Sequence, residues 1–406
     1  MTIVTCLNGF AAGTAVRKEG IIMYDLSELI AQNREWIDAT WEKVDRKLSR
    51  LAVKDRGTIP VYTVNGVHQD QSKELINHWC NGFWGGMMWL MYKGTGNEEY
   101  RKTAERNEEM MDEALRNYKA LHHDVGFMWH ILSGANYRLT GNEASCIRNL
   151  YAATVLASRY DCEGDYILAW NWGCEGYSII DCLMNLPLLY WASEEIGDER
   201  FRKLAIRHMN MTLRDHIRPD GSVNHIVDHD REKPGIKQIL AGQGYRPDSC
   251  WSRGLAWAVY GSVISYIHTG KPEYLEAATR TADYFIEHCK ETGYKPVIDF
   301  DAPAEPVYYD SSAGTIASCG MLEIAKCLPK EKGRKYAEAA IKLLKACDES
   351  FCNYEDDQDA LVLMASGSYP QTEEQIAETV HRPLIFGDFY FVEALLKLKG
   401  DDFFIW

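Results

Sequence analysis

Hydrophobic positions recur along most of this chain at spacings of three and four residues, the pattern of helices that bury one face. Two such faces are formed by Leu26, Ile30, Ile37 and Trp41 and by Ala104, Met111 and Leu115. Few segments show the two-residue alternation that is typical of strands. The pattern therefore predicts an all-α protein.

A short polar sequence interrupts the helical pattern at residues 95–98, 140–143, 196–199 and 269–272. Each copy has a glycine that can end a helix in the left-handed conformation. An Asn or Asp that can cap the next helix follows, or a proline at its first position. This is the expected joint of a helical hairpin, and its repetition predicts a chain of paired helices.

Repeated hairpins with few strands are compatible with an open solenoid or with a closed α/α toroid. The connections at 160–177, 218–250 and 296–312 are too long for tight turns, and long ordered loops on one side of a scaffold usually build a site. We therefore expect a closed toroid with these loops on its functional rim. Residues 23–406 form one catalytic domain in this interpretation, and residues 1–22 form an N-terminal extension.

The charge balance limits the possible partners. With 44 basic and 59 acidic residues the net charge is −15, and no basic run offers a face for nucleic acid. An acidic substrate could bind only where a local arginine or amide cluster overrides this field. The N-terminus lacks the order of a secretory signal and no apolar run could cross a membrane, so we expect a cytoplasmic protein without a membrane partner.

Asp181 is the first candidate for chemistry. It lies in the apolar run 179–191, where an ionised carboxylate is costly to bury, so its pKa should rise toward that of a general acid. Asn185, four residues on, should share its helix face. A structural aspartate with buried partners is the weaker alternative.

The segment His122-His123-Asp124 suggests a metal site, but neighbouring histidines should point in different directions. In the alternative interpretation Asp124 caps a helix and both histidines are packed. A second possible metal cluster has His-x3-His spacing but lies in a polar loop, where a lone match is weak. Its members are His225, Asp228, His229 and Asp230.

Arg253 lies between Trp251 and Trp257 and could offer its planar fork to a carboxylate, or simply stabilise the fold. The segment 79–86 places aromatic residues among glycines at a predicted helix start. That composition suits a platform for sugar rings, and it also suits close helix packing.

Taken together, several blocks resemble the unsaturated glucuronyl hydrolases, glycoside hydrolase family 88, from about Trp79 to Leu398. They include NGFWGGMMWLMYKGTGNEEYR, HHDVGF, IIDCLMNLPLLYWASEEIGDERFR, WSRGLAWAVYG and FGDFYFVEALLKL. The resemblance implies an (α/α)6 barrel with its site in the central cavity. It also implies hydration of the C4=C5 double bond of an unsaturated uronic acid at the end of an oligosaccharide, after which the sugar is released, without a cofactor or metal.

By this resemblance Asp181 is the general acid and base, and Asp124 is a second carboxylate that holds the sugar hydroxyls. Polar residues around the reacting ring would be His225, Gln243 and Arg253. The aromatic lining would be Trp79, Phe83, Trp251, Trp257 and Tyr369.

Three features depart from the family pattern: Asn81 stands where an aspartate is usual, Gly242 stands where some members have histidine, and the loop 366–371 lacks a Ser/Lys pattern. They leave open the sugar beyond the unsaturated residue, its linkage and its sulfation. The oligomeric state, monomer or homodimer, is also left open by the sequence. Alternatives are an unsaturated rhamnogalacturonyl hydrolase of family 105, a sugar epimerase that uses His123 and His225, and a non-catalytic helical scaffold.

Overall fold

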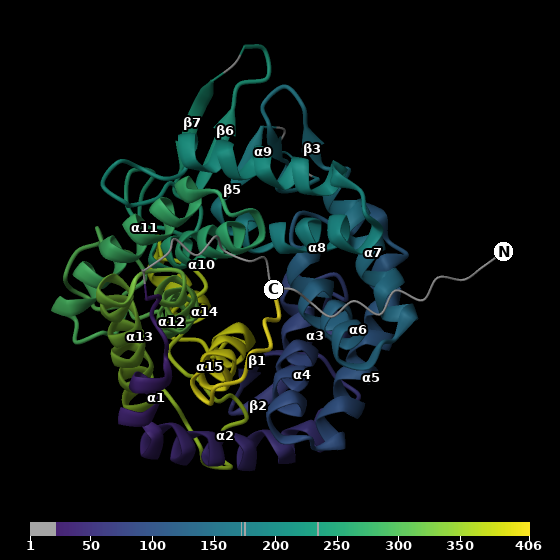
Figure 1. Ribbon diagram of the computed structural model, residues 1–406, viewed down its shortest axis with the longest axis vertical. Helices are drawn as coiled ribbons and strands as arrows, with labels where there is room; N and C mark the ends of the chain where they lie inside the picture. The colour runs from purple at the N-terminus through teal and green to yellow at the C-terminus, as the bar shows by residue number, and fades with distance from the viewer. Residues whose placement is uncertain (1–21, 172, 174–175, 234) are drawn as a thin grey trace.

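The chain forms a closed ring of helices in two layers, as Figure 1 shows. The computed structural model describes residues 22–171, 173, 176–233 and 235–406, so the expected extension 1–22 lies almost wholly outside the described residues. The inner layer consists of α4 (Phe83–Thr95), the π-helix η3 (Gly126–Gly134) with α6 (Ala135–Thr140), α8 (Leu186–Ile196), α10 (Ser252–Thr269), α12 (Ser311–Lys326) and α15 (Ile385–Leu398). The outer layer consists of α2 (Arg34–Lys54), α5 (Glu98–Leu115), α7 (Glu143–Ala157), α9 (Glu199–Asp215), α11 (Pro272–Glu291) and α13 (Lys330–Ser350). Because α15 packs between α12 and α4, the ring closes, and the predicted (α/α)6 barrel is confirmed.

The amino-acid composition of the helices explains why they form two layers. The inner helices are mostly apolar and almost wholly buried, as in α15 from Ile385 to Leu398, and the few charged residues that they carry are paired. The outer helices bury one face and carry ion pairs on their polar sides, such as Arg148–Asp112 at 2.6 Å between α7 and α5. None of the helices that the structure describes is both long enough and apolar enough to cross a membrane.

One predicted helix face is divided between two helices. Leu26 precedes α1 (Ser27–Gln32) and Ile30 lies in it, whereas Ile37 and Trp41 belong to α2. The break is at Asn33, whose side-chain amide donates to the carbonyl of Leu29 at 2.8 Å. An Asn side chain that bonds the backbone locally competes with helix continuation.

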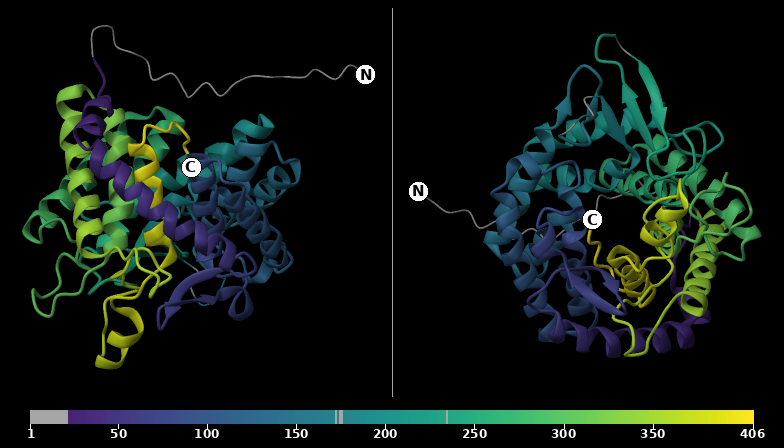
Figure 2. Two further views of the ribbon diagram at one scale, coloured as in Figure 1. Left: turned by 90° about the horizontal axis from the view of Figure 1, so that it is seen from below. Right: turned by 180° about the vertical axis from the view of Figure 1, so that it is seen from behind.

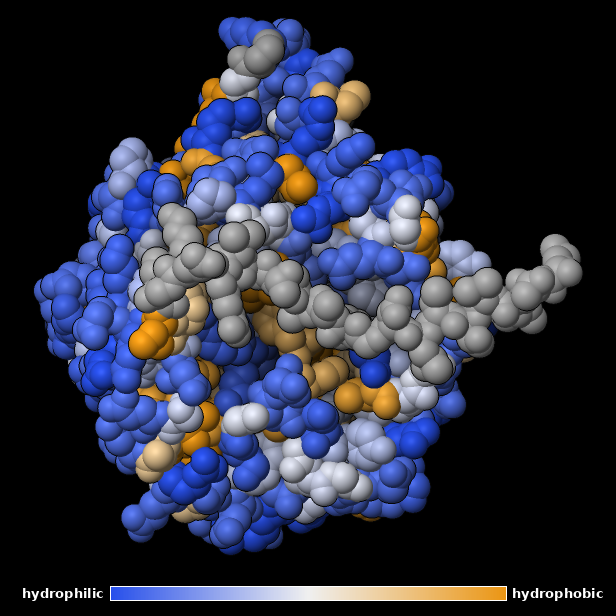
Figure 3. Space-filling view, in the orientation of Figure 1, coloured by the Kyte–Doolittle hydropathy of each residue, from blue (hydrophilic) through white to orange (hydrophobic). Residues whose placement is uncertain are grey.

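The four predicted joints are present. Gly96, Gly141, Gly197 and Gly270 end the inner helices α4, α6, α8 and α10 with φ of 71°, 74°, 65° and 69°. The next residue caps the outer helix in three cases, as when Asn97 accepts a bond from the Glu99 N–H at 3.0 Å. These joints lie at the end of the barrel that faces the viewer in Figure 1. Figure 3 shows this face as largely hydrophilic, with apolar side chains around a hollow near its centre.

The longer connections from outer to inner helices gather at the opposite end, seen in the right panel of Figure 2. They contain short elements: β1 (Pro60–Val64), β2 (Val67–Asp70), α3 (Gln71–Glu74), η1 (Trp79–Gly82), η2 (Tyr118–Ala120), β3 (Tyr160–Asp161), β4 (Tyr166–Ile167), β5 (Tyr177–Ile179), η4 (Ile180–Met184), β6 (Ile226–His229), β7 (Ile236–Leu240) and α14 (Glu373–Thr379). The antiparallel sheet β5-β6-β7 was not predicted, because β5 and β6 are short and lie far apart in the sequence.

A buried charge network stabilises the joint end of the barrel. The ammonium group of Lys397 lies 2.7 Å from Glu323 and 3.3 Å from Glu393. The Trp406 indole N–H also donates to Glu393, at 3.1 Å. Burial alone would raise the pKa of Glu323, but the charges of Lys397 and Lys326 lower it to about 2.

We predict that Lys397→Met lowers the free energy of unfolding by about 3–5 kcal/mol, because it leaves buried carboxylates without their cation. Lys399→Ala, in the turn after the same helix, is the matched control. Its ammonium lies 3.8 Å from Asp38 and its side chain is 28% exposed, so the loss should be about 0–1 kcal/mol. Urea unfolding measures both, and equal losses would contradict the role given to the buried network.

Candidate active site

The inner helices all begin at the same end of the barrel, and their first turns bring the candidate residues together. Trp79 begins η1 and Phe83 begins α4, while Asp124 precedes η3 and Asp181 precedes α8. Arg253 lies in the first turn of α10. Free N–H groups at helix starts attract anions. The site can therefore favour an acidic sugar although the chain carries a charge of −15.

Asp181 lies in the 3-10 turn η4 and not inside a continuous helix, since α8 begins only at Leu186. Its side chain is 14% exposed, and its Oδ1 has no hydrogen-bond partner. Burial first, and then the nearby charge of Asp124, raise the pKa of Asp181 to about 8, while Arg253 lowers it. The carboxyl group therefore carries a proton at neutral pH, as a general acid requires.

His225 faces Asp181 across 3.6 Å, from its Nε2 to the Asp181 Oδ1. The two residues meet because β5 pairs with β6, and the Ile180 N–H donates to the carbonyl of His225 at 3.0 Å. The Nδ1 of His225 is 3.0 Å from both the Ala241 oxygen and the Gln243 nitrogen. Burial lowers the pKa of His225 to about 3, so the imidazole is neutral and its free Nε2 points toward Asp181.

Gly242, one of the departures from the family pattern, makes room for His225. A Cβ at this position would lie 2.3 Å from the His225 Nδ1, and its φ of +57° is left-handed. Asn81, another departure, is structural. Its buried amide donates to the carbonyls of Leu75 and Ile76 at 3.1 and 2.8 Å, which an ionised aspartate could not do.

Asp124 is held by three side chains. Its Oδ2 lies 3.1 Å from the His122 Nδ1 and 3.2 Å from the His123 Nε2, and its Oδ1 lies 3.3 Å from the Asn185 amide. Burial raises the pKa of Asp124, but His123, His122 and Asn185 outweigh it and lower the value below normal. The residue at the N-cap of the following helix is Val125, and the Asp124 carboxylate bonds side chains rather than a helix N–H, so the capping alternative does not hold.

Two expectations about this segment are corrected. The imidazoles of His122 and His123 do not diverge but converge on one carboxylate, and the three possible ligand atoms lie within 4.8 Å of one another. Asn185 does not sit beside the Asp181 carboxyl group; it reaches Asp124 and also accepts the Phe127 N–H at 2.9 Å. A site that works without metal stays a prediction.

The predicted aromatic lining divides into exposed and buried members. Trp79 and Tyr369 are partly exposed and can present a ring face to a sugar. Phe83 and Trp257 have no exposed surface, and Trp251 is 2% exposed, so they pack behind the cavity. The buried indole N–H of Trp251 has no hydrogen-bond partner among the described residues. The indole N–H of Trp257 faces the Asp181 carboxyl group, and this interaction lowers the pKa of Asp181.

Arg253 does not lie as predicted. Its guanidinium carbon lies 4.6 Å from the ring centroid of Trp251 and 5.1 Å from that of Phe386, so Phe386 and not Trp257 is the second stacking partner. Its N–H groups donate to Asp310 at 2.5 Å, to the carbonyl of Gly367 at 2.8 Å and to the carbonyl of Ser366. Most of the fork is therefore occupied by protein, and Asp310 is a partner that sequence reasoning missed.

Gln243 connects the same loop to the reacting centre. Its side-chain amide donates to the Gly367 carbonyl at 2.6 Å, and its own carbonyl accepts the Tyr369 N–H at 2.9 Å. Because its backbone N–H contacts His225, Gln243 links the loop 366–371 to the Asp181–His225 pair.

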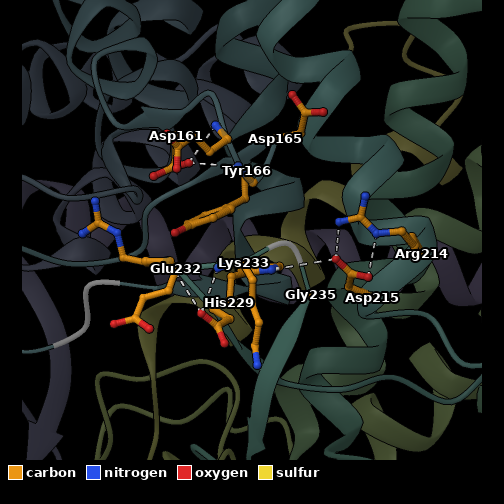
Figure 4. Close-up of a pocket in the computed structure, with 13 residues that line it drawn as sticks. Asp161, Asp165, Tyr166, Arg214, Asp215, His229, Glu232, Lys233 and Gly235 are labelled. Carbon is orange, nitrogen blue, oxygen red and sulfur yellow. Dashed lines mark hydrogen bonds and ion pairs between the residues drawn. The ribbon is translucent and has the colours of Figure 1, made fainter.

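The residues 225–230 do not converge on a metal. They form strand β6 rather than a loop, and His229 turns its Nε2 to Ser178 at 2.8 Å, away from His225. Asp228 accepts a bond from Gln238 at 2.9 Å. A pocket beside this hairpin is shown in Figure 4, where His229 and Tyr166 lie near the Arg214–Asp215 ion pair.

A buried carboxyl group beside aromatic rings, at one end of an (α/α)6 barrel, suits a carbohydrate-active enzyme, and comparison with known families identifies the class as glycoside hydrolase. A model of Glycosyl Hydrolase Family 88 matches residues 56–350. The chain belongs to this family.

The relatives agree with that assignment. The unsaturated glucuronyl hydrolase of Bacillus sp. (strain GL1) is 35% identical over 344 residues, 82% of this chain and 90% of that protein. The unsaturated chondroitin disaccharide hydrolase of Streptococcus pyogenes serotype M1 is 34% identical over 331 residues, 80% of this chain and 82% of that protein. A solved structure named as UGL with dGlcA-Glc-Rha-Glc has a TM-score of 0.81 at 31% identity, covering 88% of this chain and 97% of that chain.

Proposed function

We propose that this protein is an unsaturated glucuronyl hydrolase, which releases a 4-deoxy-4,5-unsaturated uronic acid from oligosaccharides made by polysaccharide lyases. The observation that carries the proposal is Asp181, a carboxyl group whose pKa is raised to about 8 and whose Oδ1 is unpartnered. Relatives named for unsaturated glucuronyl and chondroitin disaccharide substrates support this substrate class.

In the proposed reaction Asp181 donates its proton to C4 of the double bond. Protonation leaves a positive charge at C5, and a water molecule attacks C5. The Asp181 carboxylate then accepts a proton from that water. The product is a hemiketal at C5, whose ring bond to O5 opens to give a ketone at C5. This leaves a hemiacetal at C1, which collapses to an aldehyde and releases the remaining sugar as an alcohol. His225 lies 3.6 Å from Asp181 with its Nε2 free, so it is placed to orient the water.

Asp124 has a different proposed role because its charge is stabilised. As a carboxylate at neutral pH it can accept hydrogen bonds from sugar hydroxyls. Its charge also raises the pKa of Asp181, so it keeps the acid protonated. Trp79 and Tyr369 offer ring faces to the substrate, and Phe83 packs against Trp79 with ring centroids 5.8 Å apart. Trp251 packs on His225 at 4.2 Å and Trp257 on Phe127 at 5.2 Å, between ring centroids. Gln243 and Arg253 hold the loop that carries Tyr369.

The epimerase alternative has less support from the geometry. It requires two histidines that can exchange protons with a sugar, but the Nε2 of His123 is engaged by Asp124 at 3.2 Å. Burial also lowers the pKa of His123 to about 4. Membership of family 88 favours the unsaturated glucuronyl substrate over the family 105 alternative.

We predict that kcat/KM falls as the pH rises through about 8, because Asp181 of the free enzyme then loses the proton that it must donate. Loss of the C=C ultraviolet absorbance of an unsaturated disaccharide measures the rate. Asp124→Asn removes a charge that raises the pKa of Asp181, so the residual activity of this variant should decline at lower pH. If the pH at which activity declines were the same in Asp124→Asn as in the unchanged protein, the two carboxyl groups would not interact.

We predict that Asp181→Asn keeps the fold and sugar binding but lowers kcat by roughly 10²–10⁴-fold, since an amide cannot deliver the proton. Circular dichroism and calorimetric binding of the disaccharide are the controls. A variant that folds and turns over at nearly the normal rate would exclude Asp181 as the acid.

We predict that Arg253→Lys raises KM about tenfold or more with a smaller change in kcat. A lysine can keep the pairing with Asp310 but loses the fork that also holds the carbonyls of Ser366 and Gly367. A lost charge-assisted bond costs about 1.5–3 kcal/mol. Arg246→Lys, at an exposed arginine paired with Asp248, is the matched control and should leave KM unchanged.

A further inference from the structure

Residues 403–406 lie in the centre of the ring of helices. After α15 the chain turns back toward the barrel axis, as Figure 1 shows, and the left panel of Figure 2 places this segment toward the joint end. Ile405 has no exposed surface and Trp406 is 2% exposed. We infer that Trp406 is a positioning residue for the proposed reaction, whose indole closes the barrel behind the reacting site and keeps water from Asp181. This inference rests on the proposed hydrolase function.

The Trp406 indole contacts aromatic rings from every second helix of the inner layer. It stacks on Tyr390 of α15, with ring centroids 5.9 Å apart and planes at 5°. Phe127 of η3 and Tyr260 of α10 meet it edge to face, at centroid distances of 6.2 and 6.0 Å. In order around the ring these are the second, fourth and sixth inner helices, so the indole spans the barrel axis rather than lining one wall.

The same rings continue to the reacting site. Phe127 and Tyr390 both pack on Trp257, at centroid distances of 5.2 and 5.6 Å, and the Trp257 indole N–H faces the Asp181 carboxyl group. Trp406 therefore lies behind the rings that form the floor under Asp181. Figure 3 shows a hollow at the centre of the joint face, so solvent approaches the barrel axis from that side.

One arginine fixes the segment that carries Trp406. Arg138 lies in α6, which continues η3, and it donates to the carbonyls of Phe404, at 2.7 Å, and of Ile405. Its guanidinium carbon also lies 5.4 Å from the ring centroid of Phe403. These contacts hold the three residues before Trp406, so the position of the indole does not depend on its own packing alone.

The centre of the barrel would hold water if the indole were removed. The Tyr390 hydroxyl group is buried and has no hydrogen-bond partner among the described residues. The Trp406 N–H contacts both carboxylate oxygens of Glu393, at 3.1 and 3.3 Å, and these would lose a donor. Buried water requires about two to four polar partners, and this space would supply them, whereas a purely apolar cavity stays dry.

Water behind the floor would stabilise the charged form of Asp181. Burial is the largest cause of the raised pKa of Asp181, so admitting water should lower that pKa. A substitution at position 406 leaves in place the other titratable or charged groups that face this carboxyl group, which are Asp124, Cys182, His225, Arg253 and Tyr390. The decline of kcat/KM that is expected near pH 8 should therefore move to lower pH.

The test compares Trp406→Ala with Trp406→Phe in the full chain. Both variants lose the bond to Glu393, but only phenylalanine keeps a ring on the barrel axis. With an unsaturated disaccharide, we expect the decline of kcat/KM to move down by about 0.5–1 pH unit in Trp406→Ala, a fraction of the shift that full burial causes. It should stay in place in Trp406→Phe. Added indole should move it back in Trp406→Ala, because indole can fill the cavity that the side chain leaves.

Phe403→Ala, at a partly exposed ring of the same segment, is the control for general loosening and should not move the decline. Trp406→Leu keeps part of the apolar volume and takes the place of Trp406→Ala if that variant does not fold. It should show a smaller shift in the same direction. Infrared titration of the Asp181 carboxyl group, assigned with Asp181→Asn, gives the same pKa without substrate or turnover.

Two results would overturn the role of Trp406. One is a folded Trp406→Ala or Trp406→Leu protein in which Asp181 titrates as in the unchanged protein. The other is an equal shift in Trp406→Ala and Trp406→Phe, which would assign the effect to the bond with Glu393. A shift of the infrared titration in a protein that does not cleave the disaccharide would support the closure of the barrel and overturn the proposed function instead.

Discussion

Two carboxyl groups are buried at the same end of the barrel, and the site depends on a difference in their pKa values. Close buried carboxylates cannot both be ionised at low cost. Asp124 receives two imidazoles and an amide, which stabilise its charge, whereas the Asp181 Oδ1 has no partner. Desolvation and the charge of Asp124 together keep Asp181 protonated at neutral pH. One carboxyl group is thus stabilised as an anion and the other in its protonated form, although both are aspartates.

The barrel makes this arrangement possible because its inner helices are buried on all sides. Their first turns form a floor in which a carboxyl group is desolvated, and the aligned peptide dipoles of the helices give that end a local positive potential. An acidic chain can therefore hold an acidic sugar without a large basic patch. The π-helix η3 begins directly after Asp124 and Val125, and π-helical turns are frequent at functional sites.

The rim of the site is held by contacts between distant segments. Arg253 and Gln243 both bond the Gly367 carbonyl, so the loop that carries Tyr369 is attached to the residues around His225. Asp310 accepts the Arg253 guanidinium and caps α12 through the Ser312 N–H. The position of Tyr369 therefore depends on a buried ion pair rather than on the loop's own sequence.

Local sequence determined the features that depend on near neighbours. Gly96 and Asn97 mark a helical joint wherever the chain runs, and the apolar run around Asp181 shows that its carboxyl group will be desolvated. Asn185, by contrast, serves Asp124, 61 residues away, and Arg253 is paired with Asp310, 57 residues away. No local rule relates such residues, and only closure of the ring brings the helix starts together. The sequence by itself therefore determined the class of fold and indicated Asp181 as the candidate acid, whereas the tertiary structure decided which partners each polar group has, because those partners come from different helical pairs.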